Sequence, residues 1–252
     1  MDPLPGADGV PALPEHTEPV ELLEGLCTTR AIRRFRPDPV SDHHLGAMCF
    51  AATRAPTGSN RQPFRLLVLR DGETAAEAKA LLGRSFRHLW AEKRAADGYD
   101  TGSGAGSGAE DSPKARTART MQRFVDRFED TPVVVLACVE PWRGDDLTVG
   151  ASVYPTCQNL LLAARALGYG GVLTMWHAGV DGELRDLLAI PDHVVIAATV
   201  AIGKPEGNHG PVRRRPVNEL VFDGRWGYAG AWATEPPGTR HTGRPPPTRA
   251  GG

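Results

Sequence analysis

The spacing of apolar and polar residues along the chain predicts helices and strands in mixed order. Leucines recur at helical spacing in PVELLEGLC (19–27), and a second amphipathic helix follows Ser41, whose hydroxyl is a typical N-cap. The continuous apolar run TPVVVLACVE (131–140) is typical of a central strand that is covered on both faces. Further strands are predicted over 65–71, 170–176 and 193–205, and further helices over 73–83, 85–96, 114–128, 151–168 and 181–190, with Gly83 and Gly168 expected to end two of them.

These elements predict an α+β fold with one sheet inside helices. The order contains too few strict strand–helix–strand alternations for a doubly wound sheet. Neither the dinucleotide fingerprint GxGxxG after a first strand nor the phosphate loop GxxxxGK[ST] is present in the sequence. The helix predicted over 151–168 is apolar nearly all round, so it must be covered on all sides, and an interface between subunits is one way to cover it.

Composition divides the chain into one folded domain, expected over 19–227, and two terminal segments. Residues 1–18 and 228–252 are rich in proline and glycine, which predicts that they are disordered. Within the domain, residues 84–130 contain a flexible glycine- and serine-rich loop over 97–112. Such a loop inside a compact domain is typical of a mobile lid, and a surface insertion without a role is the alternative.

The overall charge limits the classes of partner. Among 252 residues, 29 Lys and Arg face 30 Asp and Glu, and the net charge of −1 argues against nucleic acid or an anionic membrane as partner. The four cysteines lack the spacing of a zinc site, which predicts no metal and a reducing compartment. No apolar run approaches the ~20 residues that span a bilayer, and the amino terminus lacks a signal-peptide pattern, so a soluble cytoplasmic protein is expected.

Three polar segments are candidates for chemistry. TTRAIRRFRPDPV (28–40) gathers four arginines, which suit phosphate or carboxylate, although a solvated basic segment is the alternative. APTGSNRQPF (55–64) has small residues that allow a close approach of backbone to a ligand, and Asn60 and Gln62 offer donors and acceptors, although an ordinary turn has the same composition. GPVRRRPVNEL (210–220) is a second arginine cluster, either half of a phosphate clamp or a basic surface turn.

Five segments occur in the order seen in the FMN-dependent nitroreductase family: TTRAIRRF, APTGSNRQPF, NLLLAARALGYGGVLTMW, LRDLLAIPDHVVIAATVAIGKP and RRRPVNELVFDGRWG. The chain therefore resembles a nitroreductase-like flavoprotein over about residues 20–227. The resemblance implies a central, mostly antiparallel sheet flanked by helices, in an intertwined homodimer with FMN at the interface. It also implies an oxidoreductase that passes hydride from NAD(P)H through flavin N5 to a small aromatic, quinone or nitro-type acceptor, by a ping-pong mechanism.

The same resemblance implies how the first arginine cluster is used. Arg30 and Arg33 correspond to basic positions around the FMN phosphate and the N1/O2 edge of the flavin, with Ala31 between them as a backbone contact. Arg34 and Arg36 are expected to be solvated or structural. Charge-assisted forks suit the phosphate, and a guanidinium near N1/O2 stabilises the negative charge of a reduced flavin.

The remaining contacts implied for FMN come from three other segments. Many relatives carry a basic residue where this chain has Thr29, so Arg214 is expected to compensate at the phosphate. The full set beyond the first cluster is Pro56, Thr57, Gly58, Asn60 and Gln62 from the second subunit, Leu173, Thr174 and Met175 along the isoalloxazine face, and Arg214 with Arg215 at the phosphate.

The resemblance requires no dedicated acid or base, because the cofactor carries the chemistry. His177 follows Trp176 beside the flavin strand and is a candidate for a proton donor, with a structural histidine as the alternative. Phe86, Trp90 and Tyr99 lie in the lid region over 84–130. They either stack on an aromatic substrate or pack the lid against the core.

Two other functions stay open from the sequence. APTGSNRQ and NELVFDGRWG also resemble cyclodipeptide oxidase subunits, which oxidise a peptide or natural-product intermediate and act with a small partner protein. A flavin-binding protein without turnover is the second, in which the lid would keep the nicotinamide away from the flavin. Bleaching of a bound flavin by NAD(P)H separates the main hypothesis from the non-catalytic one.

Overall fold

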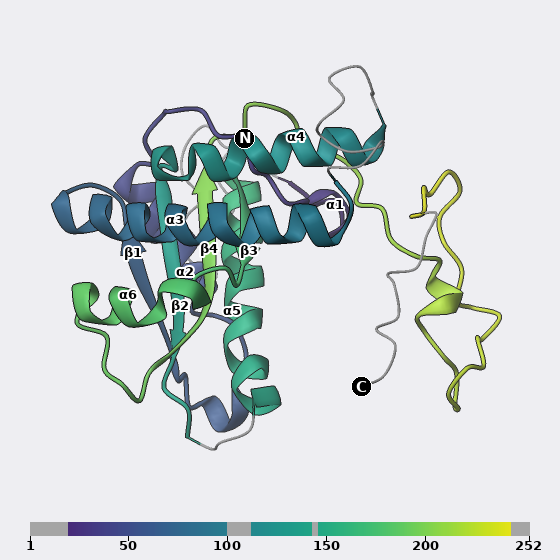
Figure 1. The fold of residues 1–252 in the computed structure, drawn as a ribbon. Coiled ribbons are helices and arrows are strands. Elements are labelled where there is room, and N and C mark those ends of the chain that lie inside the picture. The colour runs from purple at the N-terminus through teal and green to yellow at the C-terminus, as the bar shows by residue number, and fades with distance from the viewer. Residues whose placement is uncertain (1–19, 100–111, 143–145, 243–252) are drawn as a thin grey trace, which may run out of the picture. The chain divides into compact units, whose positions relative to one another are not determined.

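Four strands form one antiparallel sheet in the structure, a computed structural model that describes residues 20–99, 112–142 and 146–242 (Figure 1). The strands are β1 (Phe64–Leu69), β2 (Val133–Val139), β3 (Gly170–Thr174) and β4 (Val195–Gly203), in the spatial order β1-β2-β4-β3. Every neighbouring pair is antiparallel. The strand predicted over 131–140 is therefore central and buried along its whole length, and the predicted α+β class is confirmed.

Helices cover both faces of this sheet. Their bounds are α1 Leu22–Thr28, α2 Asp42–Ala52, α3 Glu73–Ala96, α4 Pro113–Asp126, α5 Asp146–Ala166 and α6 Asp181–Leu188. Alternate residues of β2 belong to the two sides: Val134 and Leu136 pack with α3, α4 and α6, whereas Val133 and Val135 pack with α2 and α5. Short 3₁₀ turns at Gly58–Asn60, Phe128–Asp130 and Ala178–Val180 connect these layers.

Two helix ends agree with the sequence prediction. The Ser41 hydroxyl accepts a hydrogen bond from the His44 backbone N–H at 3.2 Å, which is the N-cap expected for α2. Gly168 follows α5 with φ of +78°, the left-handed conformation that glycine adopts at the carboxyl end of a helix.

The helix prediction around Gly83 is wrong. Residues 73–83 and 85–96 are not two helices but one continuous helix, α3, in which Gly83 is an interior residue. A Cβ at this position would overlap the carboxylate end of Glu129, so a larger residue here would require that side chain to move. That carboxylate pairs with Arg87 one turn further along α3, at 2.8 Å.

The start of α5 also differs from the prediction. The helix begins at Asp146 rather than near residue 151, so Pro155 lies in its interior instead of near its first turn. The segment before residue 151 is polar and contains Gly150, and for this reason it carries little helical pattern in the sequence.

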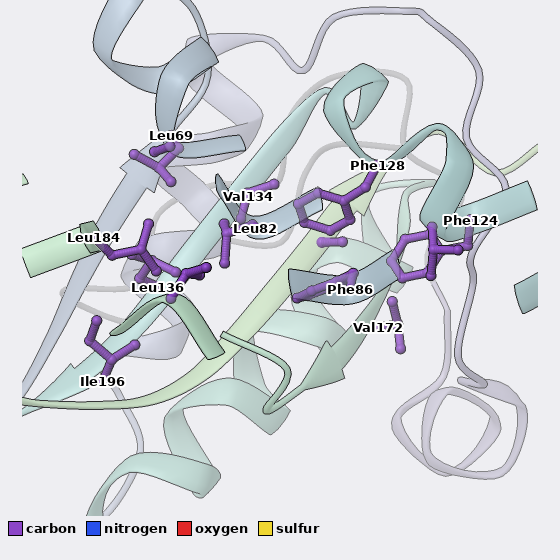
Figure 2. Packing of buried hydrophobic residues seen from close by; sticks show 14 of the residues in the cluster. Leu69, Leu82, Phe86, Phe124, Phe128, Val134, Leu136, Val172, Leu184 and Ile196 are labelled. Atoms are coloured by element: carbon purple, nitrogen blue, oxygen red, sulfur yellow. The ribbon is translucent and has the colours of Figure 1, made fainter. Parts of the chain in front are cut away.

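The second half of α3 and one face of α4 contribute side chains to the core. Figure 2 shows Phe86 from α3 beside Phe124 from α4 and Phe128, and the Phe86 and Phe128 ring centroids lie 4.3 Å apart. Trp90 is buried as well, and its indole N–H donates to the Gln122 side-chain oxygen at 2.9 Å. Helices α3 and α4 thus close one face of the sheet by packing against it and against each other.

The chain divides into two compact units, residues 1–209 and 210–252. In the second unit, Arg214 forms an isolated parallel bridge with His241, and Arg215 pairs with Glu219 at 2.9 Å. Trp232 donates to Asp223 at 3.2 Å. Disorder over 228–252 stays a prediction, and the terminal segment 1–18 and most of the loop predicted over 97–112 lie outside the described residues.

Candidate functional site

The segment that carries the first arginine cluster is fixed to the edge of the sheet by its backbone. The Ile32 N–H donates to the Gly171 carbonyl of the edge strand β3 at 2.9 Å. Further along, the Arg36 N–H donates to the Lys204 carbonyl at 2.8 Å, and the Glu206 N–H donates to the Arg34 carbonyl at 3.1 Å. These bonds hold residues 32–36 in an extended path beside the sheet, so the arginine side chains start from fixed positions.

The approach of this segment to β3 is close enough to require glycine in the strand. A Cβ at Gly170 would lie 2.6 Å from Cγ1 of Ile32, which is closer than real Cβ atoms come to other heavy atoms. Gly170, the first residue of β3, therefore leaves the space that Ile32 of the arginine segment occupies.

A hollow of about 350 Å³ lies at the carboxyl half of β3. We call it the β3 hollow, and its lining residues are Arg33, Met121, Phe124, Val172, Leu173, Thr174, Met175 and Trp176. The structure thus brings together four residues that the sequence analysis assigned to one site, namely Arg33 and the three consecutive residues of β3. Apart from Arg33 and Thr174, the lining is apolar, which suits the face of a planar ring.

A second hollow of about 270 Å³ shares Arg33 with the β3 hollow. We call it the arginine hollow, and it is lined by Arg30, Ala31, Ile32, Arg33, Arg34, Thr120 and Gly207. Arg30 is exposed there and donates to the Asn208 carbonyl at 2.7 Å. Because three guanidinium groups line this hollow, it suits an anionic group.

Arg33 lines both hollows and is the central residue of the site. Its side chain is half-buried, and burial lowers the pKa of its guanidinium from the ordinary value. Among the described residues, no ion pair or hydrogen bond joins this side chain to another group, and the nearby Tyr99 side chain only partly offsets the effect of burial on the pKa. A half-buried charge without a partner is costly, so the arrangement favours binding of an electron-rich or anionic group beside Arg33.

The turn that contains Pro56, Thr57, Gly58, Asn60 and Gln62 is at a different place in the subunit. It precedes β1 at the opposite edge of the sheet, and none of these five residues is among the described residues that line the two hollows. Its backbone is strained, because Ser59, Asn60 and Gln62 all have φ near +50°. Hydrogen bonds inside the turn stabilise it, including Gln62 N–H to the Thr57 hydroxyl at 3.0 Å.

His177 is buried in the core, with 4 % of its surface exposed. Its Nε2 lies 2.8 Å from the Ile196 carbonyl and its Nδ1 lies 3.3 Å from the Thr199 hydroxyl. These contacts assign the proton of the neutral ring to Nε2, which donates to the carbonyl, and leave Nδ1 to accept from the hydroxyl. Both ring nitrogens are therefore occupied, which favours the structural alternative for this histidine.

Burial of His177 predicts a pH dependence of stability. Burial lowers its pKa, so the unfolded chain takes up the proton first and the free energy of unfolding decreases as the pH falls below about 6.5. Burial lowers the pKa of His44 and His209 too, so they add to the effect. The urea midpoint of His177→Gln should decrease less between pH 7.5 and 5.5 than that of the parent protein. An equal decrease, or loss of turnover in a folded variant, would contradict a structural role.

The expectation that Phe86 and Trp90 contact a substrate is not supported by their positions. Both are buried in the core, with 0 % and 2 % of their surface exposed, and neither is among the described residues that line the hollows. Tyr99 is half-buried and packs on Trp90, with ring centroids 5.3 Å apart. Instead, Thr120, Met121 and Phe124 of α4 line the site. These three residues were not predicted as site residues from the sequence, in which the only signal for them is the amphipathic pattern of the helix that carries them.

Arg214 and Arg215 belong to the second unit, so their assignment to the phosphate stays a prediction. Within the described residues, no group of three or more His, Cys, Asp or Glu side chains is placed to hold a metal ion. None of the described helices is both long and apolar enough to cross a membrane.

Comparison with known proteins identifies the family. The sequence profile of the Nitroreductase family matches residues 27–204, which include the arginine segment, the turn before β1 and the whole sheet. The chain belongs to the nitroreductase family. An NADH dehydrogenase of Thermus thermophilus is 29 % identical over 200 residues, which cover 77 % of this chain and 91 % of that protein.

Solved structures of nitroreductase type share the fold. A nitroreductase with bound FMN from Desulfitobacterium hafniense is 21 % identical, with a TM-score of 0.57, over 80 % of this chain and 97 % of that one. The NADPH:FMN oxidoreductase of Vibrio harveyi, complexed with NAD⁺, is 18 % identical, with a TM-score of 0.58, over 81 % of this chain and 77 % of that one. At these identities the likeness establishes the nitroreductase fold for this chain.

Proposed function

We propose that this nitroreductase-family protein is an FMN-dependent NAD(P)H oxidoreductase that reduces a small aromatic, quinone or nitro-type acceptor by a ping-pong mechanism. The observation that carries the proposal is the position of Arg33, half-buried and without a partner among the described residues, between a largely apolar hollow and an arginine-lined one. The names of the relatives, an NADH dehydrogenase and an NADPH:FMN oxidoreductase, agree with this reaction class.

The residues present fit FMN. A flavin mononucleotide has an anionic phosphate, a polar arm and a planar ring, and the two hollows offer arginines for the phosphate and apolar walls for the ring. Arg33 lines both hollows. In this position its guanidinium can stabilise negative charge on the pyrimidine edge of the flavin ring. The pyrimidine edge of FMN would then be the partner that the Arg33 guanidinium lacks among the described residues.

FMN, when bound, supplies the acceptance and donation of hydride. The protein's own contribution is binding and electrostatics: Arg30 and the Ala31 backbone hold the phosphate arm, and Arg33 stabilises charge at the N1/O2 edge. Leu173, Thr174 and Met175 hold the ring against β3 and exclude water. In a homodimer, the strained turn from Pro56 to Gln62 reaches the flavin of the partner subunit, and Arg214 and Arg215 close on the phosphate.

A ping-pong order is expected because NAD(P)H and the acceptor use the same β3 hollow. The nicotinamide and the acceptor both have to reach the same face of the ring in the β3 hollow, so the first leaves before the second enters. Initial-rate measurements with both substrates varied should give parallel double-reciprocal lines. Intersecting lines would contradict a shared hollow.

The proposed function is tested by the visible spectrum of the purified protein, followed by anaerobic addition of NADPH or NADH. A flavin spectrum that bleaches on addition of either nucleotide supports the proposal. A flavin that stays oxidised favours a flavin-binding protein without NAD(P)H turnover. Absence of flavin binding even after added FMN would contradict the proposed function.

Replacement of Arg30 by alanine should weaken FMN binding. The lost group is a charge-assisted donor to phosphate, worth roughly 1.5–3 kcal/mol, so the dissociation constant of FMN should rise about tenfold or more. The measurement is fluorescence titration of the apoprotein with FMN. Arg36→Ala removes the same charge from an exposed position outside the hollows and serves as the control. Normal flavin content in Arg30→Ala would remove Arg30 from the phosphate site.

A further inference from the structure

A third hollow lies where the arginine segment meets the end of α4. We call it the α4 hollow; its volume is about 30 Å³, and Arg33, Arg34, Arg123 and Arg127 are among its lining residues. It shares Arg33 with both other hollows and Phe124 with the β3 hollow, so the three spaces adjoin one another. A single dinucleotide with one end in the β3 hollow can therefore place another of its groups in the α4 hollow.

The side chains that line the α4 hollow carry a net positive charge, because its arginines outnumber its carboxylates. Two carboxylates line it with the four arginines. Glu206 pairs with Arg123 at 2.6 Å, and Asp130 pairs with Arg127 at 2.9 Å. Two guanidinium charges are left over, those of Arg33 and Arg34. Arg33 is accounted for by the flavin edge, and the phosphate arm of FMN is assigned to Arg30 and the Ala31 backbone. Arg34 lines both the arginine hollow and the α4 hollow, and the proposed function assigns it no contact of its own.

Arg34 is placed to meet an anion. Its side chain is exposed, and one terminal nitrogen lies against Gly207, where a Cβ would be 3.8 Å away. Among the described residues, no acceptor pairs with its guanidinium. Arg123 donates to Glu206 through Nη2, and Arg127 donates to Asp130 through Nε, so each keeps further N–H groups that pair with no described residue.

We propose that Arg34, together with Arg123 and Arg127, binds the 2′-phosphate of NADPH and makes NADPH the preferred electron donor. NADPH differs from NADH by this one phosphomonoester dianion, and adjacent guanidinium groups recognise such a dianion with charge-assisted hydrogen bonds. A hollow of about 30 Å³ exceeds the ~10–15 Å³ that one water molecule needs, so a phosphate oxygen enters without displacing protein atoms. This inference rests on the proposed function, which places the nicotinamide in the adjoining β3 hollow.

The first test compares the kcat/KM ratio of NADPH to NADH in the FMN-loaded protein at low ionic strength, where surface charges are least screened. The parent protein should prefer NADPH, and Arg34→Ala should lower the ratio roughly tenfold, mainly through the KM of NADPH. Arg36→Ala, which removes an exposed arginine of the same segment outside the described hollows, should leave the ratio unchanged. A parent protein that prefers NADH, or an unchanged ratio in Arg34→Ala, would overturn the inference.

The second test measures binding without turnover, by calorimetric titration of the FMN-loaded protein with 2′,5′-ADP and with 5′-AMP. Tighter binding of 2′,5′-ADP, lost in Arg34→Ala and kept in Arg36→Ala, supports the subsite. Equal affinities of the two probes for the parent protein overturn it. If neither NADPH nor NADH is oxidised, the proposed function fails, and the calorimetric comparison alone decides whether a phosphate subsite exists.

Discussion

Arg33→Ala should fold normally, lose FMN on dialysis and fail to oxidise NAD(P)H. Truncation of one partner in a buried, hydrogen-bonded charge pair costs about 2–5 kcal/mol, so the dissociation constant of FMN should rise roughly thirtyfold or more. The expected loss is larger than for Arg30→Ala, because Arg30 is exposed and Arg33 is half-buried between the two hollows. Flavin absorbance per protein after dialysis, and the FMN dissociation constant by fluorescence titration, measure the effect.

The stability of the apoprotein separates this effect from misfolding. Without FMN, Arg33 is a half-buried charge without a described partner, and burial already lowers the pKa of its guanidinium. The apo form of Arg33→Ala should therefore be as stable as the parent apoprotein or more so. Arg33→Lys keeps the charge but loses the planar fork, so its FMN affinity should lie between those of the two proteins. Retention of FMN by Arg33→Ala after dialysis would contradict the assigned role.

Among the variants proposed here, Phe86→Ala should lower the free energy of unfolding the most. Phe86 is fully buried and packs on Phe128, on Phe124 and on Trp176, with ring centroids 4.3, 6.2 and 5.7 Å away. Removal of a buried phenylalanine side chain costs about 3–5 kcal/mol, because the transfer free energy is lost and a cavity is left. Equilibrium unfolding in urea measures the change. Phe50→Ala, at a position with 36 % of its surface exposed, is the control and should cost much less.

The activity of folded Phe86→Ala also tests whether this residue contacts substrate. If Phe86 acts only by packing, the variant should keep the acceptor preference of the parent protein at a temperature where it is folded. A change of acceptor preference with unchanged stability would instead return Phe86 to the substrate site.

The sequence predicts the sheet well because each strand carries its own local signal. The apolar run of β2 and the glycines that begin β3 are visible without any knowledge of the partners of these strands. The break predicted at Gly83 is wrong for a reason that no local pattern contains. The Glu129 carboxylate, which comes from a residue far along the chain, lies in the space that a larger side chain at this position would need.

The site was predictable only in part. Resemblance to the family placed Arg33 with the residues of β3, and the structure brings them together in one hollow. The α4 residues Met121 and Phe124 were not predicted, because which side of an amphipathic helix meets a hollow depends on how the helix is rotated against the sheet. Phe86 and Trp90 were candidates for stacking because aromatic side chains serve both packing and recognition, and the sequence does not distinguish the two.

The hydrogen bond from Ile32 to Gly171 also bears on self-association. β3 is an edge strand, and an edge strand with unpaired backbone groups is a template for pairing with a strand of another molecule. The arginine segment covers part of this edge, and its positive charges repel the same segment of an approaching copy. The segment that we propose to bind FMN thus also limits extension of the sheet between molecules, and its deletion should promote aggregation as well as abolish FMN binding.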